Sequence, residues 1–130
     1  MLKSAAVLEA AYNDSHQVTA LFNKNILLVL NRELGADFNV QDFEHVAFFD
    51  SERERVEMHL RAVRNVTVHV KRLEFSADLG KGETIRTEIC RKFSRTSGQD
   101  MMTQAGLTIS RWYSDPKGWF SIAEAGLPRT

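Results

Sequence analysis

The stretch YNDSHQVTALFNKNILLVLNRELGADFN, residues 12–39, determines the architecture of the first half of the chain. Its apolar residues recur at a spacing near 3.6, which predicts an amphipathic helix of about five turns. Asn13-Asp14-Ser15 is typical of a break and N-cap before such a helix, and Gly35 of a C-cap after it. Polar residues interrupt the apolar stripe at several places, which is more than a helix alone requires. The apolar residues are Val18, Leu21, Phe22, Ile26, Val29, Leu30 and Leu34.

The segments on either side of this helix differ in period. Residues 4–12 predict a short helix, whereas residues 56–62 and 66–70 alternate apolar and polar residues with period two, as half-buried strands do. The predicted strands are 43–49, 56–62, 66–70 and 84–92, arranged as an antiparallel meander with residues 76–82 as its loosest loop.

The C-terminal part of the chain predicts a helix followed by a hairpin. Ser97-Gly98-Gln99-Asp100 fits a capping box that opens a helix ending near Gly106. Strands at 107–112 and 119–123 follow, joined by the turn sequence SDPKG at residues 114–118. The fold class is therefore α+β, with two N-terminal helices, a central antiparallel sheet, and a C-terminal helix plus β-hairpin.

Composition limits the classes of partner. The chain has 130 residues, enough for one domain, with 17 Lys+Arg and 17 Asp+Glu. This balance predicts neither nucleic-acid binding nor a polybasic membrane signal. The longest apolar run, Ile26–Leu30, is too short to cross a bilayer, and residues 2–11 lack the features of a signal peptide. Cys90 is the single cysteine, so a reducing, cytoplasmic setting is expected.

Metal and nucleotide sites are not expected from the motifs. The four histidines are scattered, without HxxxH or HExxH spacing, and those in predicted strands, His59 and His69, are expected to face solvent. Gly80-Lys81-Gly82 lacks the spacing of a phosphate-binding loop, and no GxGxxG follows a predicted strand.

Glu88 and Cys90 form the most suggestive polar pair. A period-two strand places both on one face and the apolar Ile85 and Ile89 on the other. A carboxylate beside a thiol could line a polar pocket, but the pattern alone favours an exposed glutamate next to an edge-facing cysteine. An inert thiol is likewise favoured over a nucleophile, so no catalytic residue is predicted.

Short motifs in a consistent order extend over nearly the whole chain. They include Tyr12-Asn13-Asp14, Val18-Thr19-Ala20, Phe22-Asn23-Lys24-Asn25, Asn31-Arg32-Glu33-Leu34, Ala36-Asp37-Phe38, Phe43-Glu44-His45-Val46-Ala47, Val56-Glu57-Met58-His59-Leu60, Gly82-Glu83, Thr87-Glu88, Lys92-Phe93 and Trp112-Tyr113-Ser114-Asp115. In these motifs the chain resembles the histidine Nα-methyltransferases of ergothioneine biosynthesis, a branch of the S-adenosylmethionine-dependent enzymes.

The resemblance implies a fold, a reaction and a missing part. Such enzymes join a Rossmann-like methyltransferase domain to a substrate-binding domain, and methylate the α-amino group of histidine three times to give hercynine. Residues 1–93 would belong to the substrate-binding domain and residues 94–130 to the closing αββ segment of the methyltransferase sheet. The glycine-rich loop for S-adenosylmethionine would precede Met1, so no cofactor is expected on this chain. Its partner would be the missing N-terminal portion, a separate chain, or, through an exposed sheet edge, a second copy.

The resemblance also implies roles for four residues. Tyr12 would help hold the amino-acid end of the substrate, Met58 would pack near its ring, and Glu88 would accept a hydrogen bond from its imidazole. Cys90 stands where the family usually has a serine as second imidazole partner. Because a thiol is the weaker hydrogen-bonding group, weaker histidine binding or altered specificity is expected.

Three functions remain open from the sequence. The first is the substrate-recognising part of a histidine Nα-methyltransferase, inactive without its cofactor-binding part. The second is a stand-alone amino-acid-binding module, and the third an oligomeric interaction module without methyl transfer.

Overall fold

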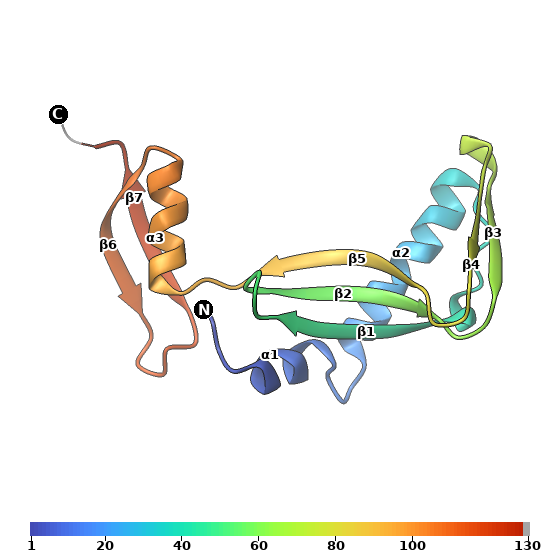
Figure 1. Ribbon diagram of the computed structural model, residues 1–130, viewed down its shortest axis with the longest axis horizontal. Coiled ribbons are helices and arrows are strands. Elements are labelled where there is room, and N and C mark those ends of the chain that lie inside the picture. Colours follow the sequence, from blue (N-terminus) through green and yellow to red (C-terminus); the bar gives the residue numbers. More distant parts are fainter. Residues whose placement is uncertain (129–130) are drawn as a thin grey trace. The chain divides into compact units, whose positions relative to one another are not determined.

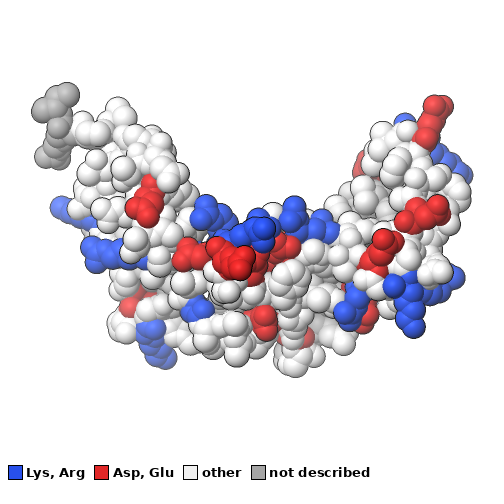
Figure 2. All heavy atoms as spheres, in the orientation of Figure 1, with Lys and Arg blue, Asp and Glu red and all other residues white. Residues whose placement is uncertain are grey.

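The computed structural model describes residues 1–128 and divides into two compact units (Figure 1). One unit is Ser4–Cys90, and the other combines Met1–Lys3 with the chain from Arg91 onward. The described residues form α-helices and antiparallel strand pairs, which confirms the predicted α+β class. None of their helices is long and apolar enough to cross a membrane. Acidic and basic side chains intermingle on the face drawn in Figure 2.

The larger unit contains a three-stranded and a two-stranded sheet. Strand β1 (Phe43–Asp50) pairs antiparallel with β2 (Arg55–Ala62), and β5 (Thr84–Arg91) adjoins β2, giving the order β1-β2-β5. Strands β3 (Val66–Val70) and β4 (Phe75–Leu79) form a separate hairpin between β2 and β5 in sequence. Short 3₁₀ turns, η1 (Val40–Asp42) and η2 (Lys71–Leu73), precede β1 and β4.

This order corrects two predictions. The sheet is not a simple meander, because β2 pairs with β5 rather than with the next strand, β3. The segment predicted as the loosest loop, residues 76–82, begins inside β4, where Ser76 and Leu79 pair with His69 and Val66 of β3. Cross-strand pairing therefore orders a segment that has little strand propensity of its own.

The core lies on one face of the three-stranded sheet. The predicted alternation in β2 is confirmed for its apolar residues, since Val56, Met58, Leu60 and Ala62 are all buried, but not for Glu57, which is buried on the opposite face. Helix α1 (Ala5–Tyr12) contributes Leu8 to one cluster, with Ala47, Val56 and Met58. Helix α2 (Val18–Leu34) contributes Leu27 to a second cluster, with Phe43, Leu60 and Ala62. Removing each of the larger side chains among them, such as Leu27 or Phe43, from water contributes about 1.5–3 kcal/mol.

Helix α2 begins and ends as predicted but packs through an unexpected face. Its apolar residues Val18, Leu21 and Phe22 are 64%, 68% and 66% exposed. The buried residues are Asn23 and Leu27, one turn apart. The Asn23 amide donates to the His59 carbonyl of β2 at 3.1 Å, so a polar contact and one leucine, rather than the apolar stripe, fix the helix on the sheet.

Residues before and after α2 fix its two ends, and Asn13 also bonds the free edge of β1. The N-cap position is Gln17, at φ +57°, and not one of the predicted residues 13–15, but the Asp14 carboxylate accepts from the backbone N–H groups of Val18 and Thr19, both at 2.9 Å. Gly35 ends the helix at φ +62°, a left-handed conformation that glycine adopts without strain. The Asn13 amide donates to the carbonyl of Ala47 at 2.8 Å and accepts from its N–H at 3.1 Å. It therefore occupies backbone groups that strand pairing leaves unused.

In the smaller unit, helix α3 (Arg95–Gln104) precedes the hairpin of β6 (Thr108–Ser114) and β7 (Ser121–Gly126). The capping box lies three residues earlier than predicted, since Ser94 and Ser97 cap each other's backbone N–H groups. Gly98 faces the Trp112 ring, which an added Cβ would approach to 3.2 Å. A side chain at residue 98 would therefore push α3 away from β6.

Truncating Leu60 tests the core. Leu60 has no exposed surface, so Leu60→Ala removes packed methyl groups and leaves a cavity, and the expected loss is about 2–5 kcal/mol in the free energy of unfolding. Leu73→Ala is the matched control, since Leu73 is 61% exposed and should cost far less. Urea denaturation measures both, and equal losses would contradict this position of the core.

The Asp14 cap predicts an acid-dependent stability. The N–H groups of Thr19 and Val18 lower the pKa of Asp14 to about 2. Because the folded state holds the carboxylate ionised, its contribution is complete above the unfolded pKa near 4 and is lost as the pH falls toward 2. Asp14→Asn keeps an acceptor oxygen without titrating, so the unfolding free energy of this variant should fall less between pH 5 and 3 than that of the wild type. Parallel pH profiles in urea denaturation would contradict this origin of the shift.

Candidate functional site

A cavity of about 280 Å³ lies between helix α2 and strands β2 and β5. Two of the four predicted site residues, Met58 and Glu88, line it together. The remaining lining residues come mainly from α2 and include the apolar residues that the helix leaves exposed. They are Phe22, Asn23, Asn25, Ile26, Val29 and Thr87. The cavity therefore combines apolar walls, amide groups and one carboxylate.

Met58 is fixed by its neighbours in the sheet, whereas Glu88 is exposed. Met58 is buried in the cluster of Leu8, Ala47 and Val56, so its side chain is fixed from below. The Thr87 hydroxyl donates to the Met58 carbonyl at 3.0 Å and ties β5 to β2 beside the cavity. Glu88, the next residue along β5, is exposed and accessible to a ligand.

Tyr12 and Cys90 are placed differently. Tyr12 ends α1, is half-buried, and packs against the same cluster as Met58. Cys90 is half-buried on β5, two residues after Glu88. Neither is among the residues found to line the cavity, and Tyr12 is related to it only through the cluster that contains Met58. The shared face of Glu88 and Cys90 stays a prediction.

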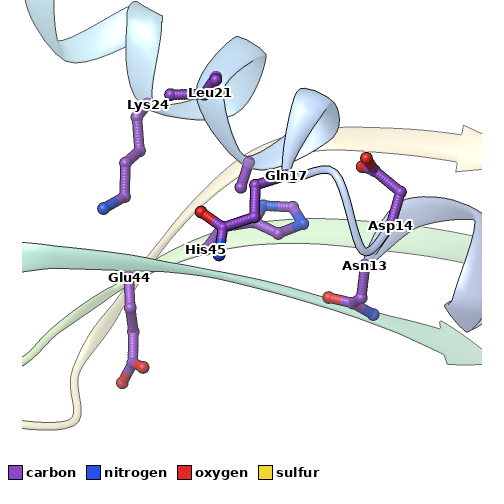
Figure 3. Close-up of a pocket in the computed structure, with 8 residues that line it drawn as sticks. Asn13, Asp14, Gln17, Leu21, Lys24, Glu44 and His45 are labelled. Atoms are coloured by element: carbon purple, nitrogen blue, oxygen red, sulfur yellow. The ribbon is translucent and has the colours of Figure 1, made fainter.

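A second cavity of about 350 Å³ lies between the α1–α2 connection, α2 and β1 (Figure 3). Its lining residues are Asn13, Asp14, Gln17, Ala20, Leu21, Lys24, Glu44 and His45. Several of its polar groups already have structural partners: Asn13 bonds Ala47, Asp14 caps α2, and His45 Nε2 bonds the Tyr12 carbonyl at 2.8 Å. These side chains stabilise the fold, which makes the cavity beside Met58 the better candidate for ligand recognition.

Of the two histidines predicted to face solvent, His69 does so and His59 does not. His69 is exposed as predicted, with a 3.1 Å contact to Asp37. The His59 side chain is only 13% exposed, because it stacks on Phe48 at 5.2 Å and bonds the Glu57 carboxylate at 2.9 Å. This bond, with that from Arg55, holds the pKa of buried Glu57 below its usual range. Within residues 1–128, no group of three His, Cys, Asp or Glu side chains could hold a metal ion.

Sequence reasoning missed the contribution of α2 to the cavity. Phe22, Asn23 and Ile26 appear in the sequence as parts of an ordinary amphipathic helix, and their role depends on which face the helix turns inward. The one signal in the sequence was the amide of Asn23 in the middle of the helix. In the structure this amide is buried and donates to the His59 carbonyl of β2.

Comparison with known proteins gives the chain a family. The family model described as "Histidine-specific methyltransferase, SAM-dependent" matches residues 1–126. A histidine N-alpha-methyltransferase of Mycolicibacterium smegmatis is 42% identical over 125 residues, and one of Mycobacterium tuberculosis is 43% identical over 125 residues. Each alignment covers 96% of this chain but 39% of the relative, so the chain spans well under half the length of the relatives it matches.

Proposed function

The chain belongs to the S-adenosylmethionine-dependent, histidine-specific methyltransferase family, and we propose that it is the substrate-recognising part of such an enzyme. The reaction we assign to the whole enzyme is methylation of the histidine α-amino group to hercynine in ergothioneine biosynthesis. The single cysteine favours a reducing, cytoplasmic setting for it.

One observation carries the proposal: Met58 and Glu88, which the family resemblance relates to the imidazole ring, line one cavity. An imidazole N–H needs an acceptor, and a carboxylate gives a charge-assisted bond that a substrate without this N–H cannot form. A thioether packs favourably against an aromatic ring, so Met58 offers the ring an apolar contact. The two side chains together therefore suit a flat ring with a polar edge.

Tyr12 and Cys90 complete the proposed recognition set. A phenol can donate to a carboxylate, which suits Tyr12 to the amino-acid end of histidine. Cys90 would be the second partner of the imidazole, in the place of the usual serine. The chain would thus orient the substrate rather than take part in bond making, and orientation alone can lower a methyl-transfer barrier by several kcal/mol.

We assign cofactor binding to the part of the enzyme that this chain does not span. S-adenosylmethionine supplies the methyl group, and Rossmann-like folds bind such a cofactor at a glycine-rich turn between a strand and a helix. The described residues do not fit that site: β5 reaches α3 through Lys92-Phe93-Ser94, which contains no glycine. We likewise propose that residues 94–130 close the methyltransferase sheet of the whole enzyme.

The exposed apolar face of α2 suits contact with this missing part. Leu21, Phe22 and Ile26 are exposed, and the latter two also line the candidate cavity. A partner covering them would exclude water from the histidine site. The same face could instead join two copies of this chain, which analytical ultracentrifugation would detect as a dimer.

Replacing Glu88 tests the proposed recognition. Glu88→Gln keeps the shape of the side chain but removes its charge, so the affinity for L-histidine should fall by about tenfold or more. Isothermal titration of the purified chain measures this, with Glu124→Gln in the smaller unit as the control that should bind normally. Wild-type chain that takes up no histidine, or a Glu88→Gln variant that binds equally well, would contradict the proposal.

Replacing Cys90 tests the second imidazole contact. Cys90→Ser restores the stronger hydrogen-bonding group, and we expect histidine to bind several-fold more tightly. Cys90→Ala removes the group altogether and should bind no better than wild type. If the serine and alanine variants had the same affinity for histidine, residue 90 would not contact the ring.

A further inference from the structure

We infer that Asn23 and His45 are positioning residues, which fix Tyr12 to strand β2 next to Met58 and thereby set the distance across the proposed histidine site. The inference deepens the proposed function and rests on it for its meaning. It concerns two side chains outside the predicted set of Tyr12, Met58, Glu88 and Cys90.

Three hydrogen bonds connect α1, β1, α2 and β2. His45 Nε2 of β1 lies 2.8 Å from the carbonyl oxygen of Tyr12, at the end of α1. His45 Nδ1 lies 2.9 Å from Nδ2 of Asn23 on α2. The same Asn23 nitrogen donates at 3.1 Å to the carbonyl of His59, which directly follows Met58 on β2. Figure 3 shows the His45 ring standing between β1 and the segment before α2.

The hydrogen-bond partners of His45 and Asn23 allow only one placement of their hydrogens. A backbone carbonyl only accepts, so the Tyr12 carbonyl requires a hydrogen on His45 Nε2. The His59 carbonyl likewise identifies the Asn23 atom that faces it as the amide nitrogen, which only donates. His45 Nδ1 must therefore be the acceptor of the second amide hydrogen, so the ring is neutral and carries its hydrogen on Nε2.

These hydrogen bonds fix both the distance and the orientation between Tyr12 and β2. Asn23 is 3% exposed, so an amide hydrogen left without a protein partner there would be costly, whereas His45 is half-buried. One turn later on α2, Leu27 reaches the sheet by packing alone, which tolerates small sliding movements. An amide group with both hydrogens bonded does not tolerate such sliding, because each of its two hydrogen bonds requires a particular distance and angle. The Tyr12 backbone is thus held at a fixed place relative to β2.

The position of Tyr12 matters because its side chain packs against the cluster that contains Met58. If the His45 bond were lost, the end of α1 would keep its apolar contacts and the bonds of Asn13 to Ala47 of β1, but it would lose its hydrogen-bonded connection through Asn23 to β2. We expect Tyr12 and Met58 to separate slightly and histidine binding to weaken, without general unfolding of the unit.

Nitrogen NMR of the wild-type chain tests the hydrogen arrangement first. At a pH where the His45 ring is neutral, ¹⁵N-imidazole spectra should show a protonated Nε2 and an unprotonated Nδ1. A ring hydrogen on Nδ1, or a mixture of tautomers exchanging freely, would overturn the inference. This measurement needs no ligand and no substituted protein.

Two variants then separate the bonds of His45. His45→Gln can still donate to the Tyr12 carbonyl, whereas His45→Asn places its amide near the former Nδ1 and keeps only the Asn23 contact. The nuclear Overhauser effect between the Tyr12 ring and the Met58 methyl should persist in His45→Gln and weaken in His45→Asn. Histidine affinity should follow the same order, with a loss of up to roughly tenfold in His45→Asn, because no more than the net contribution of the lost hydrogen bond can be transmitted to the site.

The readouts distinguish failure of this inference from failure of the proposed function. A wild-type chain that binds no histidine would contradict the function, while the tautomer and the Tyr12–Met58 signal still decide the positioning. Unchanged Tyr12–Met58 signals in a folded His45→Asn, or equal effects of the two substitutions, would overturn the positioning role.

Discussion

The buried amide of Asn23 is the constraint on which the arrangement of the larger unit depends. An amide that is 3% exposed needs partners for its hydrogens, and both lie on the sheet, at His45 of β1 and the His59 carbonyl of β2. Meeting them turns one face of α2 inward and the apolar residues around Phe22 outward. The cavity beside Met58 exists because the helix lies in this orientation.

The same orientation gives the outer face of α2 a use. An apolar stripe that was buried in the core could not line a cavity, but Phe22 and Ile26 border Met58 and Glu88 because they remain uncovered. At the edge of the sheet opposite β5, the Asn13 side chain bonds the backbone of Ala47 on β1. Fixed polar contacts on one side of α2 and an exposed apolar surface on the other agree with our proposal that a second part of the enzyme covers the site.

Local signals predicted local structure well. Helix α2 begins after the Asp14 cap and ends at Gly35, and the buried alternation from Val56 to Ala62 follows the pleat of β2. The inward face of α2, the pairing of β2 with β5 and the ordering of β4 were not predictable, because each depends on contacts distant in sequence. His59 was misplaced for the same reason, since Phe48 covers it from the neighbouring strand.

The candidate site, too, was predictable only in part. Met58 and Glu88 were predicted from motifs of the family and line one cavity, whereas the contribution of α2 to that cavity depends on the packing of the helix. The most direct test is an NMR titration of the isotopically labelled chain with L-histidine. The account predicts shift changes centred on Met58, Thr87 and Glu88. Changes centred on the second cavity around Gln17 and Lys24, or no saturable change, would contradict it.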